Sequence, residues 1–159
     1  MACGTGEHPC TQLALEALER TVQPGWSVAD IGSGSGILTS AALLLGAGWA
    51  LAADTDESAM LFAHEDFQLN HVRPLLLTGS ADAVAGSVFD VTVANISGTV
   101  LLSILDDLLR ITKPRGTLIL TGFTEAECGR FQEMFPDAAA STRDGWACLE
   151  IFKRDNLSR

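Results

Sequence analysis

Hydrophobic residues occur along the chain in two alternating patterns. In some segments they follow one another or fill every second position, as in a strand, and in others they recur at helical spacing. The segment 11–20, TQLALEALER, shows the helical pattern, with Leu13, Leu15 and Leu18 among polar residues and a Pro-Gly stop at 24–25. Helices are therefore expected at 11–20, 37–45, 57–70, 100–111 and 125–135, and strands at 27–31, 49–53, 73–77, 89–94, 117–121, 138–142 and 147–152.

Strands that alternate with helices predict a parallel sheet with helices on both faces. The Arg-Asp-Gly sequence at 143–145 suits a tight turn, so the last two strands are expected to form an antiparallel hairpin. The 159 residues fit one domain, 1–159. The prediction is a Rossmann-like α/β fold with a mostly parallel seven-stranded sheet and a C-terminal antiparallel hairpin. Ligands of such sheets bind at the carboxyl ends of the strands, here at 32–36, 54–56, 79–82 and 95–97.

The segment after the first strand, VADIGSGSGIL, places an acid and three glycines between a strand and a helix. Its candidate cofactor-binding residues are Asp30, Gly32, Ser33, Gly34 and Gly36. Glycines let the backbone turn sharply and lie close to a ligand, although a glycine triplet alone also suits a tight turn or close packing. An acid two residues before the first glycine favours S-adenosylmethionine, which carries a sulfonium and an ammonium rather than a pyrophosphate.

The spacing of these glycines does not match the nicotinamide-cofactor fingerprint G-x-G-x-x-G. Read from Gly32, the third glycine of that pattern would stand at Ile37, and read from Gly34 it would stand at Thr39. Both registers fail, which argues against a dehydrogenase fragment.

Polar residues follow the second and third strands as well. Asp54 ends the second strand, where its carboxylate can accept two hydrogen bonds from a ribose diol and would repel a phosphate on that ribose. Asp54 and Thr55 are assigned to the cofactor. Asp54 taken alone would also suit the cap of the following helix, and for that cap we expect Asp56 or Thr55. Candidates for the adenine follow the third strand: Ser80, Ala81 and Asp82.

The amino-acid composition limits the classes of molecule that the protein is expected to bind. The formal net charge is −10, from 20 acids and 10 bases, which argues against direct nucleic-acid binding and favours neutral or cationic partners. No apolar run is long enough to span a bilayer, and no signal peptide is visible. The four cysteines and three histidines lack metal-site spacing, so no metal is expected. We expect a cytoplasmic protein that does not bind membranes, and the residues leave its oligomeric state open.

Several motifs together resemble one known family. The chain opens on GTGEHPCT at 4–11, and ADIGSGSGIL, AADTDESA, VANI and KPRGTLILTGF follow in order. This pattern resembles the PrmA family, the methyltransferases of ribosomal protein L11, whose hallmark loop is GTGxHxTT. Cys10 stands where that loop usually has Thr. The resemblance implies a class I methyltransferase fold, S-adenosylmethionine as cofactor, and methylation of amino groups of a basic ribosomal protein.

The resemblance also implies roles for individual residues. The first loop would fold over the cofactor, with Thr5 and Gly6 near its methionine end. His8 would either brace the loop by a hydrogen bond or act in catalysis. Asn95, after the fourth strand, is assigned to the cofactor site and would also orient the substrate amine through its amide oxygen, the alternative being a cap for the following helix.

Family members carry an N-terminal domain that recruits the ribosomal protein. This chain begins at Met1, directly before the GTG loop, so that domain is expected to be absent, either in a fragment or in a shortened relative. The alternatives are a methyltransferase for another protein or a small amine, and a non-catalytic S-adenosylmethionine-binding module.

Overall fold

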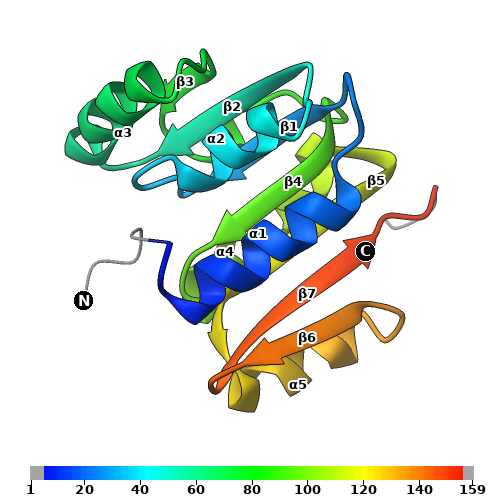
Figure 1. Ribbon diagram of the computed structural model, residues 1–159. Helices are drawn as coiled ribbons and strands as arrows, with labels where there is room; N and C mark the ends of the chain where they lie inside the picture. The colour runs from blue at the N-terminus through cyan, green and yellow to red at the C-terminus, as the bar shows by residue number, and fades with distance from the viewer. Residues whose placement is uncertain (1–5, 156–159) are drawn as a thin grey trace.

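The computed structural model describes residues 6–155, in which helices and strands alternate as expected (Figure 1). The helices are α1 (Pro9–Thr21), α2 (Ile37–Leu44), α3 (Glu57–Leu69), α4 (Gly98–Ile111) and α5 (Glu125–Met134), with a 3-10 turn η1 (Ala81–Ala83). The strands are β1 (Ser27–Ile31), β2 (Trp49–Asp54), β3 (Leu75–Thr78), β4 (Phe89–Asn95), β5 (Thr112–Thr124), β6 (Ala139–Arg143) and β7 (Trp146–Phe152).

The strands form one seven-stranded sheet in the order β3-β2-β1-β4-β5-β7-β6. The pairs among β1 to β5 are parallel, and β7 is antiparallel to both β5 and β6. The predicted α/β fold with a C-terminal antiparallel hairpin is therefore confirmed. Because β1 lies between β2 and β4, the chain leaves the middle of the sheet in opposite directions, which is where ligands of this fold class bind.

The helices cover the sheet in two layers, with α1 and α2 in front of it and α4 and α5 behind it in Figure 1. Successive residues of a strand point to opposite faces. Val28 accordingly packs with Leu13 of α1, whereas its neighbour Ala29 packs with Leu101 of α4. Helix α3 packs against Ala52 of β2, on the same face as α1 and α2. Both faces of the central strands are buried, which explains their continuous apolar runs.

Four elements begin earlier than their sequence pattern suggests: α1, α4, β5 and β7. Helix α1 starts at Pro9, where a proline loses no helical hydrogen bond, and the Nδ1 atom of His8 caps it by accepting from the Cys10 N–H at 3.3 Å. Strand β5 starts at Thr112, which pairs with Phe89 before a shift of register brings Thr117 opposite Val91. The intervening residues form a bulge, a feature of pairing that local patterning does not reveal.

Strand β3 begins later than expected. It runs over Leu75–Thr78 because it pairs with the last four residues of β2, Thr78 opposite Asp54. Pro74, which has no N–H to donate, precedes it. The turn between β6 and β7 agrees with its prediction: Asp144 and Gly145 both have positive φ, 50° and 82°, as a two-residue hairpin turn requires.

Candidate functional site

The loops that follow β1, β2, β3 and β4 lie at one edge of the sheet. The arrowheads of the parallel strands point to this edge, and the described residues just before α1 lie beside it (Figure 1). Backbone hydrogen bonds tie the loops together: the Gly32 N–H donates to Ala53 O at 2.8 Å, and the Gly79 N–H donates to Asp54 O at 2.9 Å. Gly6, the first described residue, packs so closely on α2 that an added Cβ would lie 3.1 Å from the Ile37 Cδ1. Gly6 thus lies against the start of α2, next to the glycine-rich loop, and its place beside the methionine end of the cofactor stays a prediction.

The three glycines of the loop after β1 have different surroundings. All have positive φ, +74° at Gly32, +51° at Gly34 and +77° at Gly36. A Cβ at Gly32 would lie 2.4 Å from Ile96, and a Cβ at Gly36 would lie 2.3 Å from Phe67. At Gly34 an added Cβ would meet no described atom within 4 Å. Gly32 and Gly36 therefore permit close packing, whereas Gly34 presents bare backbone to open space.

Asp30 is buried beneath this loop, with 1% of its surface exposed. Its Oδ2 accepts hydrogen bonds from Thr39, from the backbone N–H at 3.1 Å and from the hydroxyl at 2.8 Å. Its Oδ1 is buried without a hydrogen-bond partner among the described residues. Burial raises the pKa of Asp30 to about 7, against the hydrogen bonds from Thr39, and the charge of Asp54 adds to the rise. A cation or hydrogen-bond donor nearby would stabilise this carboxylate.

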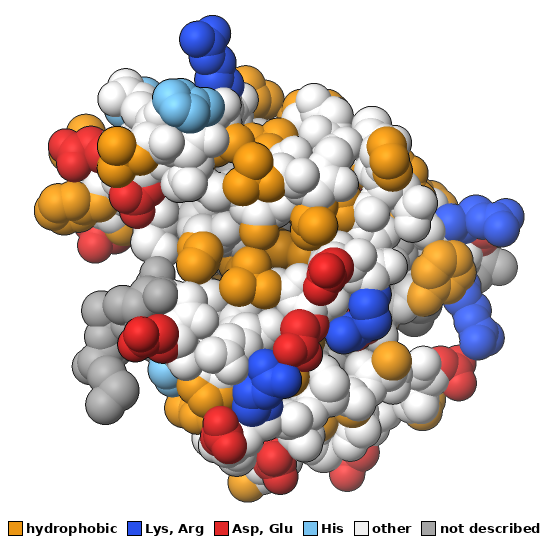
Figure 2. All heavy atoms as spheres, in the orientation of Figure 1, with side chains coloured by type: hydrophobic (Ala, Val, Ile, Leu, Met, Phe, Trp, Pro, Cys, Tyr) orange, Lys and Arg blue, Asp and Glu red, His pale blue; other side chains and the backbone are white. Residues whose placement is uncertain are grey.

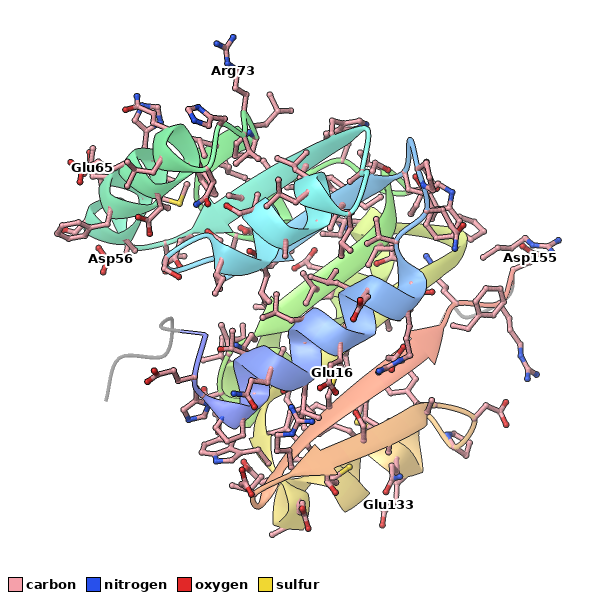
Figure 3. The ribbon with its side chains drawn as sticks, in the orientation of Figure 1. Glu16, Asp56, Glu65, Arg73, Glu133 and Asp155 are labelled. Atoms are coloured by element: carbon pink, nitrogen blue, oxygen red, sulfur yellow. The ribbon has the colours of Figure 1, made fainter. Side chains whose placement is uncertain are left out.

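Asp54 connects the end of β2 to the glycine-rich loop. Its Oδ2 accepts from the Gly34 N–H at 2.8 Å, and its Oδ1 accepts from the Asp56 N–H at 3.0 Å. Each carboxylate oxygen retains a second lone-pair site for a ligand hydroxyl. The cap of α3 is Asp56, whose side chain accepts from the Ser58 N–H, so the capping alternatives for Asp54 and Thr55 are wrong. Figure 3 shows Asp56 at the start of α3, with exposed Thr55 just before it in the chain.

The segment after β3 forms the next part of the same edge. Ser80 is partly buried, Ala81 is fully buried, and Asp82 is exposed in the 3-10 turn η1. The carbonyl of Ala81 accepts from an Arg110 guanidinium nitrogen at 2.9 Å, which anchors the turn to α4. The three residues predicted to contact adenine thus lie just after the end of β3. Arg110 of α4 holds the turn that contains Ala81 and Asp82 in place.

Ser33 faces inward. Its side chain is buried, its hydroxyl lies 3.7 Å from the Met60 sulfur, and its N–H donates to Ala53 O at 3.0 Å. The hydroxyl and the N–H of Ser33 therefore each have a partner within the protein. Its cofactor-binding role stays a prediction.

His8 and Asn95 lie at the start of α1 and at the end of β4. The His8 ring caps α1 and contacts Trp146 edge to face, with ring centroids 4.8 Å apart. The bracing interaction expected of His8 is therefore present, and its catalytic role stays a prediction. The Asn95 Nδ2 donates to the Thr11 Oγ1 at 3.3 Å. Because the cap of α4 is Ser97, the capping alternative for Asn95 is wrong.

Thr5 lies outside the described residues. Three contributors to the site were not identified from the sequence: Thr11 beside Asn95, Thr39 beneath Asp30, and Trp146 against His8. Thr11 ends the GTGEHPCT motif, which was a signal for it, whereas Thr39 and Trp146 carry no local signal. Within 6–155, no group of three His, Cys, Asp or Glu side chains is arranged to hold a metal ion. In that same span, no helix has both the length and the hydropathy to cross a membrane.

Comparison with known sequences gives one consistent result. The family model described as "Ribosomal protein L11 methyltransferase (PrmA)" matches residues 1–154. A ribosomal protein L11 methyltransferase of Neisseria meningitidis is 38% identical over 158 residues, which cover 97% of this chain and 53% of the relative. One of Thermotoga neapolitana is 35% identical over 150 residues, covering 94% of this chain and 54% of the relative. The chain spans about half the length of these curated relatives.

Solved structures agree with the sequence matches. A ribosomal protein L11 methylase of Lactobacillus delbrueckii superposes with a TM-score of 0.86 at 32% identity, covering 94% of this chain and 81% of that one. A precorrin-6y C5,15-methyltransferase of Geobacter metallireducens superposes with a TM-score of 0.74 at 17% identity, covering 96% and 94%. At that identity the second likeness shows the fold alone.

Proposed function

Because this chain belongs to the ribosomal protein L11 methyltransferase (PrmA) family, we propose that it binds S-adenosylmethionine and methylates amino groups of a ribosomal protein. The observation that carries the proposal is the glycine-rich loop after β1. Gly34 presents open backbone there, between the buried carboxyl of Asp30 and the partly buried carboxylate of Asp54. The chain matches about half of its relatives' length, so activity and substrate are inferred for this catalytic half.

The chemistry of the donor set fits this cofactor. The Asp54 carboxylate, fixed by the Gly34 and Asp56 N–H groups, would accept from the ribose hydroxyls. The unpartnered oxygen of Asp30 lacks a donor, and a ligand that carries an ammonium and a sulfonium would favour the ionised form of this carboxyl. A pyrophosphate would disfavour that ionised form and would be repelled by the Asp54 carboxylate. These features support S-adenosylmethionine over a nicotinamide dinucleotide.

When bound, S-adenosylmethionine supplies a methyl group whose carbon–sulfur bond breaks, with the electron pair going to sulfur, as a nucleophile's lone pair attacks. An ammonium has no lone pair, so the acceptor amine must first lose a proton, and the methylated nitrogen can then release another to water. Asn95, the last residue of β4, would accept a hydrogen bond from the amine and direct its lone pair. The protein thus contributes alignment and electrostatics rather than a strong base.

The substrate class follows from charge and family. A surface of net charge −10 attracts basic proteins, and ribosomal proteins are basic. Such a substrate would place the reaction in the cytoplasm. We take ribosomal protein L11 as the first substrate to test, because the matched relatives are named for it.

The test has two stages. Calorimetric titration with S-adenosylhomocysteine should give saturable binding, and NADH should give none. The protein is then incubated with ribosomal protein L11 and S-adenosylmethionine, and mass spectrometry should detect an added mass of about 14 Da per methyl group on L11 amino groups. Tight NADH binding without S-adenosylhomocysteine binding would reject the cofactor. Cofactor binding without methylation of L11, a small-amine panel or lysate proteins would instead identify a non-catalytic module.

A further inference from the structure

We propose that the outward side of α2 is a docking surface for a basic, partly apolar segment of the protein substrate. This inference rests on the proposed function and deepens it, because it assigns part of this chain to substrate recruitment. Its basis is an exposed apolar stripe on α2 with acidic side chains on the helices at either side, α1 and α3. We call this surface the α2 face, and its residues are Leu15, Glu19, Ala41, Leu44, Leu45 and Asp66.

Helix α2 is apolar on both of its sides, although only one side faces the sheet. Leu38 and Ala42 are buried in the core. Ala41, Leu44 and Leu45 lie on the opposite side, at the spacing of three or four residues that places side chains along one side of a helix. Leu44 is 69% exposed and Leu45 is 38% exposed. Figure 2 shows hydrophobic side chains gathered over α2 and its border with α1, and clustered exposed apolar side chains mark interaction sites.

Two hollows flank α2 and shape the α2 face. One, of about 320 Å³, lies between α1 and α2 and is lined by residues that include Leu15, Glu19 and Leu44. The other, of about 370 Å³, lies between α2 and α3 and extends from Asp66 to Ser35 of the glycine-rich loop. The first hollow has room for an apolar side chain of a partner, and the second brings the α2 face up to the loop proposed to bind the cofactor.

The charges around the apolar stripe favour a basic occupant. Among the described residues that line the two hollows, Glu16, Glu19 and Asp66 are acidic, and none is Lys or Arg. Arg143 pairs with Glu16 at 2.9 Å, whereas Glu19 and Asp66 form no ion pair in the described part of the chain. A Lys or Arg docked beside Leu44 would therefore meet carboxylates that no cation of this chain neutralises, on α1 and on α3.

The same charges argue against a second copy of this chain as the occupant. A two-fold dimer would place the α2 face against itself, with Glu19 and Asp66 near the same residues of the other copy. Like charges brought together at a contact repel each other, whereas ribosomal proteins, the proposed substrates, are basic. The docking segment therefore carries Lys or Arg residues next to at least one apolar side chain.

The first test compares Leu44→Ser and Glu19→Lys in the methylation of ribosomal protein L11. Each substitution should raise the KM for L11 about three- to tenfold and leave kcat within about twofold, because docking affects substrate binding rather than alignment in the site. The Kd of S-adenosylhomocysteine should also stay within about twofold. Leu61→Ser, at a leucine 67% exposed on α3, and Glu133→Lys on α5 are the matched controls and should leave the KM unchanged (Figure 3 labels Glu133).

A second readout does not need activity. The probes are a dye-labelled amphipathic peptide made of Leu and Lys alone, and the same peptide with Glu in place of each Lys. Fluorescence anisotropy should show tighter binding of the Lys peptide to the original chain. Glu19→Lys should weaken binding of the Lys peptide and strengthen binding of the Glu peptide, and Leu44→Ser should weaken binding of the Lys peptide. Thermal unfolding shows that both variants fold.

An unchanged KM in both Leu44→Ser and Glu19→Lys would overturn the inference, as would an equal rise in Glu133→Lys. A dimer that sedimentation velocity detects and that Leu44→Ser dissociates would assign the α2 face to a second copy instead. If the original chain methylates nothing, the proposed function fails, and the peptides still decide for or against a basic occupant. Binding of the Lys peptide that neither variant changes rejects it.

Discussion

At the scale of single residues, burial and backbone conformation decide what the carboxyl groups and glycines of the site can do. Asp30 is a carboxyl group inside the protein with one satisfied oxygen and one unpartnered oxygen. Burial penalises its ionised form, so the pKa of Asp30 rises from its ordinary value of about 4 to about 7. The folded protein therefore binds a proton at this site over a pH range in which the unfolded chain does not.

The uptake of a proton by Asp30 on folding should appear in the pH dependence of the free energy of unfolding. Between about pH 4 and pH 7 Asp30 is protonated in the folded state and ionised in the unfolded state, so its contribution to stability falls as pH rises through this window. From pH 5 to pH 7 the loss amounts to about 2 kcal/mol, at roughly 1.4 kcal/mol per proton and pH unit. Urea unfolding at pH 5, 6, 7 and 8 measures it. Asp30→Asn should lose this component, and parallel pH profiles for the two proteins would contradict the assignment.

The glycines allow a matched comparison. Gly34→Ala should lower affinity for S-adenosylhomocysteine at least tenfold, because its methyl group would enter the open space where we propose that the cofactor binds. The positive φ of this residue should cost about 1 kcal/mol of stability. Gly36→Ala should instead cost more than about 2 kcal/mol, because its Cβ would overlap Phe67.

Gly129→Ala in α5, where an added Cβ meets no described atom within 4 Å, is the control and should raise stability by roughly 0.5–1 kcal/mol without an effect on binding. Calorimetry and urea unfolding give the two quantities. Normal affinity in Gly34→Ala would show that the cofactor does not approach this backbone.

At the scale of elements, the C-terminal hairpin holds the helix that carries the first loop. Side chains at four-residue intervals lie along one side of a helix. In α1 that side faces β7 and Arg143 at the end of β6, and Figure 3 labels Glu16 on this part of α1. The contacts are His8 with Trp146, Gln12 and Glu16 with Arg143, and Arg20 with Glu150. The hairpin therefore helps to place Thr11 and His8 at the edge of the sheet.

The hairpin turn offers a test of this element. Asp144 has φ 50°, a conformation that a β-branched residue resists. Asp144→Val should destabilise the protein by about 1–2 kcal/mol, whereas Asp144→Gly should be nearly neutral, since glycine adopts this conformation freely. Chemical denaturation measures both. Equal stability of the two variants would mean that the turn does not hold the hairpin in this register.

At the scale of the whole molecule, the two ends of the parallel strands differ in the charged residues that they carry. Acids follow the carboxyl ends of β2 and β3, at Asp54, Asp56 and Asp82, whereas Lys113 and Arg115 lie near the start of β5 at the opposite edge. Figure 2 shows hydrophobic side chains over α2 and its border with α1, with acidic and basic side chains together below them. Some charges are paired locally, as Lys113 is with Asp90. The chain as a whole has 20 acids and 10 bases.

This charge predicts a salt effect on substrate use. The KM for ribosomal protein L11 should rise at least threefold between about 50 and 500 mM NaCl, because exposed charges are screened over that range. The kcat should change little, since alignment within the site depends on buried contacts. Steady-state kinetics with a small uncharged amine acceptor provides the control. A KM that does not respond to salt would exclude electrostatic recruitment of a basic protein by this surface.

Local patterning was sufficient for much of this protein. Alternating hydrophobic periods predicted the five α-helices and seven strands that the structure describes, all but β5 within two residues at each end, whereas the 3-10 turn η1 was not predicted. The spacing of the glycines, which puts Ile37 or Thr39 where a third glycine would stand, distinguished the loop from the dinucleotide-binding pattern. The family resemblance carried by the GTGEHPCT loop and the later motifs is confirmed. These features could be predicted because turns, caps and the residues at strand ends depend on neighbours close in sequence.

Tertiary structure decided what depends on contacts between distant segments. Thr11, the hydrogen-bond partner of Asn95, lies 84 positions away in the chain. The His8 ring contacts Trp146, near the other end of the chain. The inward side chain of Ser33, the bulge of β5 and the shortened β3 likewise follow from packing and strand pairing. The sequence placed acids and glycines at a strand end. Only the folded chain determined that one oxygen of Asp30 has hydrogen-bond partners and the other has none, and that Gly34 alone of the three loop glycines faces open space. Burial and the free space around a residue depend on how distant segments pack together.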